Sequence, residues 1–344
     1  MTRTAVVLFN LGGPDSPEAI RPFLNNLFND PAIIGLPWPL RPILASVISN
    51  KRQKEAREIY TRIGGRSPLL EETCAQARAL ETAVGDDDTR VFIAMRYWHP
   101  MSEDTAFEVA QFKPDRVVLL PLYPQFSTTT TGSSLKEWAR AAKKMGVTAP
   151  TTTVCCYPMQ AGVVEAHARL LKNALDDAGD QPVRVLFSAH GLPEKIVKAG
   201  DPYQWQVEQT AAAVVERSDL PDLDWQVCYQ SRVGPLAWIG PSTDDEIRRA
   251  GSDGKGAVVI PVAFVSEHSE TLVELDIEYA EMAAKAGCAP YIRVPALSVN
   301  NAFIEGLAGM VRDALEPGRP ALCANTGARV CSATWGKCPC REAA

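Results

Sequence analysis

Short apolar runs recur along the whole chain, and each is followed by a stretch with the periodicity of an amphipathic helix. The first run, Thr4 to Asn10, leads through Leu11-Gly-Gly-Pro14 to a helix start, with Ser16 as N-cap and Pro17 in the first turn. The later runs cover residues 91–95, 116–120, 152–156, 183–187, 225–228, 258–264 and 291–294. Strands that alternate with helices predict parallel sheets covered on both faces, so we expect an α/β fold.

The chain has 344 residues, which fits two domains of ordinary size rather than one. The βα rhythm divides near residues 146–151. We therefore expect two doubly wound parallel-sheet domains that face each other across a cleft, in residues 1–148 and 149–315. Residues 316–344 have few helix or strand signals and form a cysteine-rich tail.

Composition excludes several classes of protein. The net charge of −6 argues against a nucleic-acid partner, because phosphate binding needs a basic surface. No apolar run approaches the roughly 18–20 residues that a membrane span needs, and no secretory signal is visible. We expect a cytoplasmic protein.

A dense acidic stretch, Phe264 to Glu278, follows the apolar run Ala257 to Ala263. Its glutamates Glu270, Glu274 and Glu278 recur at every fourth position, so on a helix they form one stripe of carboxylates. A pitch wider than that of the α-helix would align this row better. Because ligands of open α/β sheets bind at the carboxyl ends of strands, the stripe is a candidate site.

A histidine is expected at the same sheet edge. The run Val183 to Pro193 places Ser188 and His190 at the carboxyl end of a strand. An imidazole opposite carboxylates is a natural proton acceptor, and such a set with open positions can hold Fe²⁺ loosely. The sequence lacks the Gly-x-Gly-x-x-Gly and Walker patterns of nucleotide-binding loops.

The segment at residues 31–44, here called the apolar lip, breaks the βα rhythm. It is apolar and rich in proline, so it cannot be one regular element. It is either a buried connection or an exposed lip that holds an apolar ligand or rests on a membrane surface. The basic residues Lys51, Arg52 and Lys54 follow it, which suits a ligand with an apolar body and carboxylate tails.

Several motifs, taken in order from about Val6 to Leu307, resemble the ferrochelatase family, whose members insert Fe²⁺ into protoporphyrin IX in the last step of heme synthesis. Besides the acidic stretch, the motifs are Leu8-Phe-Asn-Leu-Gly-Gly-Pro14, Tyr60-Thr-Arg-Ile-Gly-Gly65, Met95-Arg-Tyr-Trp-His-Pro100, Tyr123-Pro-Gln-Phe-Ser127, Thr131-Gly-Ser-Ser134, Phe187-Ser-Ala-His-Gly-Leu-Pro193, Gly200-Asp-Pro-Tyr203, Gln230-Ser-Arg-Val-Gly-Pro235 and Trp238-Ile-Gly-Pro241. The resemblance implies two Rossmann-like domains around a porphyrin cleft, without a nucleotide.

The resemblance also implies roles for single residues. The family's active-site histidine falls on His190 and its acidic partner on Glu270, and these two would meet the Fe²⁺ substrate. Glu274 and Glu278 match the outer acidic positions, along a helix that is partly of π type in the family. The remaining matched positions are Glu267, His268 and Phe264 in the pocket, and Leu11, Arg52, Ser67, Arg96, Tyr123 and Trp238 against the porphyrin.

The tail carries a second signal. Cys331, Cys338 and Cys340 supply three thiolates, whereas a [2Fe–2S] cluster takes four. A subset of ferrochelatases carries such a cluster, and this tail resembles its compact bacterial form. The internal cysteine of the animal type is replaced by Thr128, so Cys155 or Cys156 is expected to be the fourth ligand.

Because neighbours on a strand point to opposite faces, only one of Cys155 and Cys156 is expected to ligate, and we choose Cys156. A Cys₄ zinc site is the alternative. Cys323 is not expected to be a ligand.

Two other functions remain open. Coproporphyrin III differs from protoporphyrin in the carboxylates at its ring edge, and the apolar lip favours protoporphyrin as the less polar substrate. A heme-binding or redox-sensing module is the third possibility. The acidic row and His190 argue against it, because a binder has no need to export protons. The possible partners are protoporphyrin IX, Fe²⁺ and, through the lip, the surface of the inner membrane.

Overall fold

The first sheet gathers strands from both ends of the chain. The computed structural model describes residues 2–232, 236–319, 321–324 and 328–342. Its first sheet is parallel and has the strand order β2-β1-β3-β4-β9. The strands are β1 (Thr4–Asn10), β2 (Thr89–Met95), β3 (Arg116–Pro121), β4 (Thr151–Val154) and β9 (Leu322–Cys323).

The second sheet is also parallel, with the order β6-β5-β7-β8. Its strands are β5 (Val183–His190), β6 (Trp225–Gln230), β7 (Gly256–Pro261) and β8 (Tyr291–Arg293). His190 pairs in register with Gln230, so both residues end at the same edge of the sheet. The eight predicted strands and the α/β fold with two parallel sheets are confirmed.

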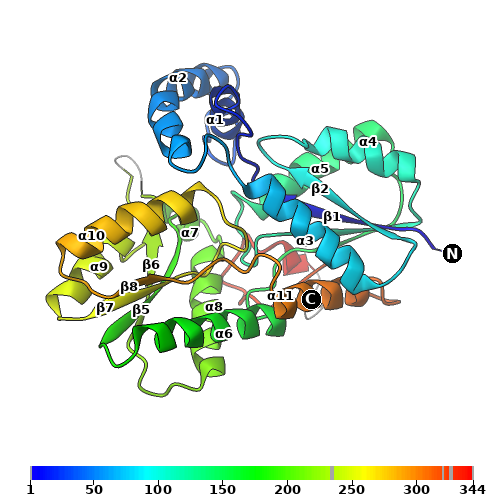
Figure 1. Ribbon diagram of the computed structural model, residues 1–344. Coiled ribbons are helices and arrows are strands. Elements are labelled where there is room, and N and C mark those ends of the chain that lie inside the picture. The colour runs from blue at the N-terminus through cyan, green and yellow to red at the C-terminus, as the bar shows by residue number, and fades with distance from the viewer. Residues whose placement is uncertain (1, 233–235, 320, 325–327, 343–344) are drawn as a thin grey trace.

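Helices flank both sheets (Figure 1). The α-helices are α1 (Ile20–Phe28), α2 (Leu40–Thr61), α3 (Leu69–Val84), α4 (Ser102–Phe112), α5 (Thr131–Met145), α6 (Ala161–Ala178), α7 (Glu194–Lys198), α8 (Tyr203–Ser218), α9 (Thr243–Ser252), α10 (Tyr279–Lys285) and α11 (Asn301–Ala314). A π-helix, η1 (Glu270–Glu278), precedes α10, and a 3₁₀-helix, η2 (Pro339–Glu342), lies near the carboxyl terminus.

Strand β1 shows why the first sheet is covered on both faces. Every residue of β1 is buried, and successive side chains point to opposite faces. Val6 and Leu8 pack with residues of α3 and α11, whereas Val7 and Phe9 pack with α4 and α5. A strand buried on both faces reads as a continuous apolar run, which is the pattern of the sequence.

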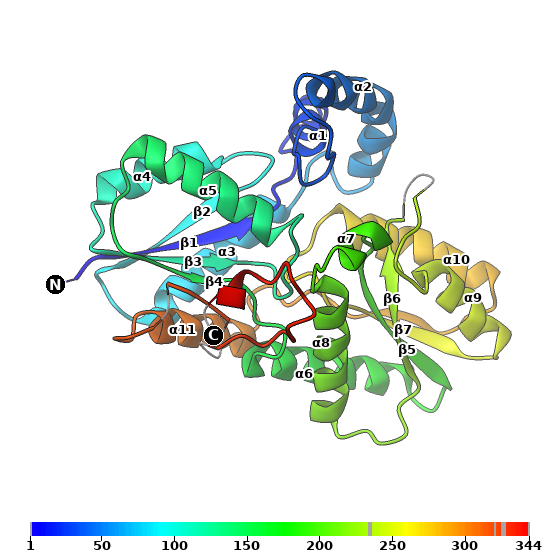
Figure 2. The ribbon, with the colours of Figure 1, turned by 180° about the vertical axis from the view of Figure 1, so that it is seen from behind.

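The end of the chain returns to the first sheet. Helix α11 packs against α3 and α6, and β9 pairs with β4 through Thr153 and Leu322. Seen from behind, the tail runs beside β4 and α8 (Figure 2). The first sheet thus spans residues 4–154 together with 322–323, and the second spans 183–293. The division of the chain at residues 148 and 315 stays a prediction.

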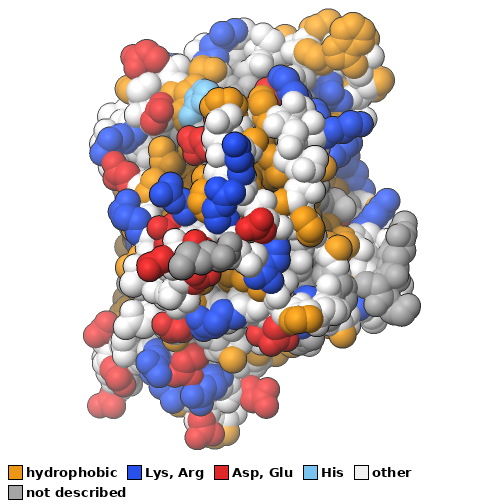
Figure 3. Space-filling view, turned by 90° about the vertical axis from the view of Figure 1, so that its right-hand side faces the viewer, with side chains coloured by type: hydrophobic (Ala, Val, Ile, Leu, Met, Phe, Trp, Pro, Cys, Tyr) orange, Lys and Arg blue, Asp and Glu red, His pale blue; other side chains and the backbone are white. Residues whose placement is uncertain are grey.

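The apolar lip joins α1 to α2, the helical pair that projects from the first sheet (Figure 1). It is irregular as far as Pro39 and helical from Leu40, as its prolines predict. Hydrophobic side chains gather at this upper end of the molecule (Figure 3). Trp38 is 78% exposed, and the other exposed apolar residues here are Ile33, Leu36, Leu40, Ile43, Leu44 and Val47. Within the described ranges, no helix is long and apolar enough to cross a membrane.

Two predicted strands extend too far. The run 258–264 was expected to be one strand, but β7 ends at Pro261. The second case has consequences for the cysteines. The run 152–156 was expected to be extended throughout, but β4 ends at Val154. Cys155 and Cys156 therefore lie beyond the strand, where the alternation of side chains between two faces no longer applies.

Candidate active site

An ion pair between His190 and Glu270 forms the centre of the candidate site. His190 is the last residue of β5, and Glu270 is the first residue of η1. The distance from His190 Nδ1 to Glu270 Oε2 is 2.9 Å. The two residues predicted to act together are thus in contact, although 80 positions separate them in the sequence.

Each member of this pair stabilises the charge of the other. Burial alone would lower the pKa of His190, but the Glu270 carboxylate outweighs it and raises that pKa above its ordinary value. Burial would raise the pKa of Glu270, but the charge and hydrogen bond of His190 bring it down to about 2. Near neutral pH, Glu270 is therefore a carboxylate that holds a readily protonated imidazole.

His268 lies on the other side of the same carboxylate, with Nε2 4.0 Å from Glu270 Oε2. Its ring lies 4.6 Å from the ring of Phe264, at an angle of 56°. Burial lowers the pKa of His268, so the two imidazoles near Glu270 differ in their affinity for a proton. Phe264, His268, Glu270 and His190 therefore lie in one group.

Glu274 joins this group through Ser231, which the sequence analysis had not singled out. The Ser231 hydroxyl donates to Glu274 Oε2 at 2.6 Å and lies 3.5 Å from Glu270 Oε2. The Ser231 backbone N–H and the side chains of Gln230 and Tyr279 also donate to Glu274. Burial and the nearby charge of Glu270 nevertheless raise the pKa of Glu274.

Ser231 lies directly after β6, where the chain adopts a φ of +59°. Gln230, the last residue of that strand, also donates to Glu274. The rule that placed His190 at the carboxyl end of its strand could have found both residues.

The acidic stripe is wound as a π-helix over Glu270–Glu278, so the wider pitch expected from the spacing is confirmed. Glu278, at its far end, does not meet the histidines. It is half exposed and lies 3.5 Å from Arg62 at the end of α2. The row thus runs from the partly exposed His190–Glu270 ion pair to the surface beside α2.

Glu267 has another partner. Its Oε1 accepts hydrogen bonds from Arg293 Nη1 at 2.5 Å and from the Ala296 backbone N–H at 2.9 Å. Burial would raise the pKa of Glu267, but its hydrogen bonds and the charge of Arg293 lower it overall. Arg293 also binds Asp276, so both acids are engaged on the β8 side of the π-helix.

Three of the predicted porphyrin contacts follow the carboxyl ends of strands in the first sheet. Leu11 follows β1, Arg96 follows β2, and Tyr123 comes two residues after β3. Arg96 donates to Asp30 and to Ser133, each at 2.7 Å, and Asp30 also accepts from the Tyr97 hydroxyl. Asp30 immediately precedes the apolar lip, so it ties the start of the lip to Arg96.

The other three predicted contacts lie in different surroundings. Ser67 is buried against Gly13, where an added Cβ would lie 2.5 Å from its hydroxyl oxygen. Trp238 packs on Gly191, the residue after His190. Arg52 lies on α2 with Glu55 as its ion-pair partner at 3.7 Å.

The thiols of the tail converge with the internal cysteines. Cys155, Cys156, Cys331, Cys338 and Cys340 are buried together, with Phe126 and Ala324. The Sγ atoms of Cys155 and Cys340 are 3.3 Å apart, and those of Cys155 and Cys156 are 3.7 Å apart. Both internal cysteines therefore reach this thiol cluster, because the chain has left β4. The side chain of Cys323 lies outside the described residues.

A helix that packs on the second sheet also contributes to the thiol cluster. Gln206 of α8 is fully buried, and its Nε2 donates to Cys331 Sγ at 3.1 Å. Hydrogen bonds from Cys331 and Cys340 lower the pKa of Cys338 well below that of an ordinary thiol. Among the residues that the structure describes, no group of three or more His, Cys, Asp or Glu is arranged to hold a metal ion.

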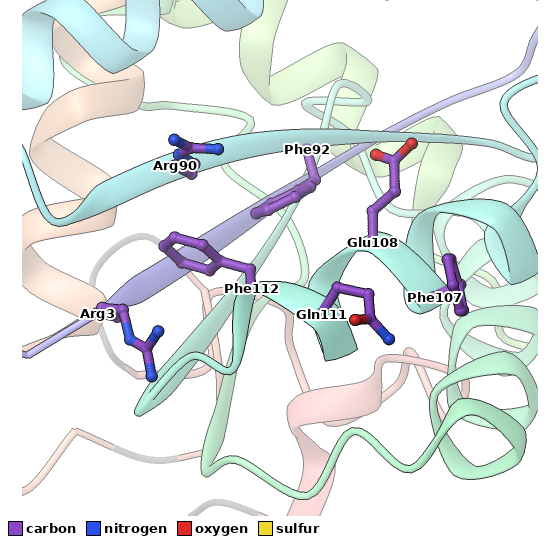
Figure 4. A pocket seen from close by; sticks show the side chains of 7 residues that line it. All are labelled: Arg3, Arg90, Phe92, Phe107, Glu108, Gln111 and Phe112. Atoms are coloured by element: carbon purple, nitrogen blue, oxygen red, sulfur yellow. The ribbon is translucent and has the colours of Figure 1, made fainter.

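A cavity of about 520 Å³ lies elsewhere, between the first half of β2 and the end of α4 (Figure 4). Arg3 and Arg90 lie near the ring of Phe112, 5.9 and 5.6 Å from its centroid. Phe92, Phe107, Glu108 and Gln111 complete the lining. None of the predicted site residues lines this cavity.

The two parallel sheets and a histidine–carboxylate site at strand ends define a protein with the chelatase fold. SirB from Bacillus subtilis with Fe³⁺ is similar over 91% of this chain and 96% of its own, with a TM-score of 0.56 at 12% identity. A sirohydrochlorin chelatase SirB from Bacillus subtilis subspecies spizizenii in complex with cobalt gives a TM-score of 0.55 at 11% identity, over 91% of this chain and 95% of its own. At such identities the likeness concerns the fold alone.

The sequence relatives identify the family. The family profile named Ferrochelatase matches residues 3–315. Ferrochelatase from Caulobacter vibrioides is 59% identical over 347 residues, covering 99% of each chain. Ferrochelatase from Phenylobacterium zucineum is 57% identical, over 99% of this chain and 98% of its own. The chain belongs to the ferrochelatase family.

Proposed function

We propose that this chain inserts Fe²⁺ into protoporphyrin IX, with release of two protons, to form protoheme in the last step of heme biosynthesis. The observation that carries this proposal is the 2.9 Å contact between His190 Nδ1 and Glu270 Oε2 at the carboxyl end of the second sheet. The family membership and the acidic row that leads away from this pair support the same reaction.

His190 is the proposed proton acceptor for the pyrrole nitrogens. Glu270 raises the pKa of this imidazole, so it binds a proton more readily than an isolated histidine. A base must lose its proton again before the next turnover. The carboxylate of Glu270, whose pKa is about 2, holds the imidazolium by charge but does not itself keep a proton. His190 and Glu270 are also the proposed contacts of the incoming iron.

Glu274 is the proposed acceptor of the proton that leaves the His190–Glu270 pair. Its pKa is raised, and the Ser231 hydroxyl lies between it and Glu270, at 2.6 and 3.5 Å. A hydroxyl can accept one hydrogen bond while donating another, so Ser231 can relay a proton that leaves the His190–Glu270 pair to Glu274. Glu278 continues the row to the surface. Glu267 has no direct part in this route, because Arg293 and Ala296 engage its carboxylate.

The porphyrin is proposed to lie between the two sheets and below the apolar lip. Leu11, Arg96, Tyr123, Phe264 and Trp238 would line its place, and Ser67 and Arg52 would meet its propionates. Cations and hydroxyls suit carboxylates. Contacts made far from the reacting nitrogens could offset the cost of bending the ring, roughly 1–5 kcal/mol.

Anaerobic incubation with Fe²⁺ and each porphyrin in turn tests the proposal, with the Soret band as the signal. We expect insertion into protoporphyrin IX. Faster insertion into coproporphyrin III would support the coproporphyrin alternative. Binding of heme without insertion into either porphyrin would contradict the enzymatic reading and favour a heme-binding or redox-sensing module.

We further propose that the thiol cluster holds a [2Fe–2S] cluster through Cys331, Cys338, Cys340 and one internal cysteine, for which Cys156 remains our choice. Five thiols are buried together, and the Gln206 side chain donates a hydrogen bond to one of them, which supports a site for thiolate ligands. Bound there, the cluster would join the tail to the interior and supply a one-electron redox couple. Visible absorbance of protein isolated without oxygen separates it from a Cys₄ zinc site, which is colourless.

We also propose that the protein is cytoplasmic and touches the inner membrane through the apolar lip. The exposed side chains of Trp38, Leu40 and Ile43 support this contact, because apolar groups at an interface bind acyl chains. Trp38→Ser should reduce co-sedimentation with lipid vesicles. Unchanged vesicle binding would contradict the lip as the contact, and Phe107→Ser, at an exposed apolar residue of α4, is the matched control.

A further inference from the structure

Arg293, the last residue of β8, binds one carboxylate that precedes the acidic row and one that lies in the same helix as the row. Its Nε and Nη2 atoms meet both oxygens of Asp276 at 2.6 Å, and its Nη1 meets Glu267 Oε1 at 2.5 Å. The guanidinium is largely buried, with 12% of its side chain exposed. One side chain thus holds the residue three positions before the π-helix and a residue in its last turn.

The contacts of Glu270 and Asp276 depend on the winding of the helix. Both residues lie within η1, six positions apart. At about 4.4 residues per turn, those positions turn the helix by about 490°. At about 3.6 residues per turn, they turn it by about 600°. In an α-helix, Asp276 would therefore lie about 110° further round the axis from Glu270. Arg293 could not then keep its contact with Asp276 while Glu270 keeps its contact with His190.

A second contact from the same strand supports the wide winding. The Tyr291 hydroxyl donates to the backbone carbonyl of Leu275 at 2.7 Å. Tyr291 and Arg293 alternate on β8 with one residue between them, so they point to the same side of the strand. β8 therefore contacts one flank of η1, while His190 and Ser231 contact the other.

We propose that Arg293 is a positioning residue that keeps residues 270–278 in the π winding. This winding lets Glu270 reach His190 while Glu274 reaches Ser231. Relaxation to α winding would turn Glu274 relative to Glu270 by about 70° about the helix axis, since four residues each turn about 18° further. Both contacts could not then be kept. The inference rests on the proposed function for its catalytic consequence, but not for the winding itself.

The test compares Arg293→Met with the wild-type enzyme. We expect kcat to fall about 10–100-fold, which is the range found for residues that orient the side chains in direct contact with a reacting group. KM for the porphyrin should stay within about twofold of the wild-type value. A crystal structure of the variant should show residues 270–278 rewound or displaced, and the pH–rate profile should shift because His190 has lost its carboxylate. Arg293→Lys should recover little, since a lysine cannot bind two carboxylates in the same forked geometry.

Two controls separate positioning from stability. The triple variant Glu267→Gln, Asp276→Asn, Arg293→Met leaves no unpaired charge and should regain thermal stability without regaining kcat. Arg312→Met, at an exposed arginine of α11, should leave both unchanged.

Wild-type kcat or intact π winding in Arg293→Met would overturn the inference, and so would recovery of kcat in the triple variant. A wild-type enzyme that inserts no iron would contradict the proposed function. The winding in the variant crystal structure would then still decide the role of Arg293.

Discussion

The His190–Glu270 pair and the thiol cluster are both close groups of titratable side chains, but the groups favour one another's charge in the pair and oppose it in the cluster. In the pair, opposite charges lie 2.9 Å apart and each favours the ionised form of the other. In the thiol cluster the groups are alike, and hydrogen bonds and charge from neighbouring thiols raise the pKa values of Cys155 and Cys331. The pKa of Cys338, by contrast, is lowered, chiefly by hydrogen bonds from Cys331 and Cys340, which favours its thiolate.

This difference teaches what each region needs. The acid–base pair is electrostatically complete within the protein and can cycle protons without another charge. The thiol cluster cannot hold four thiolates by itself, because each added negative charge opposes the next. A positively charged iron–sulfur core would remove that opposition. The comparison predicts that the pair governs turnover and that the thiols govern the attachment of the tail.

The largest expected effect is on the pair. His190→Ala should lower kcat by roughly 10²–10⁴-fold, because it removes the proposed proton acceptor. Porphyrin binding, followed by fluorescence, should remain largely intact. His99→Ala, at an exposed histidine paired with Asp104, is the control and should turn over normally. Loss of porphyrin binding with normal turnover at saturation would refute the role of His190.

The next effect falls on the thiols. Cys331→Ser should abolish the visible absorbance of protein isolated without oxygen, since it removes one of the four proposed ligands of the [2Fe–2S] cluster. The tail should also become more sensitive to protease, and the melting temperature should fall. Cys74→Ser alters a cysteine outside the thiol cluster and should keep the absorbance. Equal spectra for the two variants would show that Cys331 is not a ligand.

A smaller effect is expected at the link between the carboxylates. Ser231→Ala removes the hydroxyl that donates to Glu274 at 2.6 Å. A hydrogen bond to a charged group contributes about 1.5–3 kcal/mol, so kcat should fall about tenfold or more, with unchanged porphyrin binding. The loss should also raise the pKa of Glu274 further and shift the pH–rate profile upward. Ser252→Ala, whose hydroxyl bonds only to a helix carbonyl, should leave the profile in place.

The smallest effect on turnover is expected at His167. This residue shows how burial changes the pKa of a histidine that has no hydrogen-bond partner among the described residues. It is fully buried, neither ring nitrogen has a hydrogen-bond partner among the described residues, and burial lowers its pKa from 6.5 to about 4. The pKa of His167 is lower in the folded protein than in the unfolded chain. The free energy of unfolding is therefore unaffected by His167 above pH 6.5 and decreases as the pH falls toward 4. The loss should reach about 3 kcal/mol.

His167→Leu should remove that pH dependence while leaving kcat at neutral pH unchanged. Urea unfolding at pH 7 and pH 5 measures the difference. An unchanged pH slope in the variant would mean that other groups carry the acid sensitivity.

Local pattern was sufficient for the fold class and for the centre of the site. A buried strand appears in the sequence as an apolar run, whichever strands it pairs with. Each run is followed by a helix, so the α/β architecture follows from the sequence. The same reasoning placed His190 at a strand end and the glutamates on one helix. The four-residue spacing of those glutamates even indicated the wider winding of Glu270–Glu278.

Contacts between residues far apart in the sequence decided the other features of the sites. The partner of Glu267 is Arg293, which no spacing along the chain connects to it. The placement of Cys155 beside Cys340 depends on where β4 stops and on how β9 pairs with it. The spacing of apolar residues along the chain predicts neither the end of β4 nor its pairing with β9.

The sequence by itself determined the elements, the family and the chemistry at the strand ends, because these depend on residue types and short spacings. Only the tertiary structure decided which charges meet. It paired Glu270 with His190 across 80 positions, engaged Glu267 with Arg293 and brought the tail thiols to Cys155 and Cys156. The physical reason is that the energy of a charge depends on the groups within a few ångströms of it, and folding alone sets that neighbourhood.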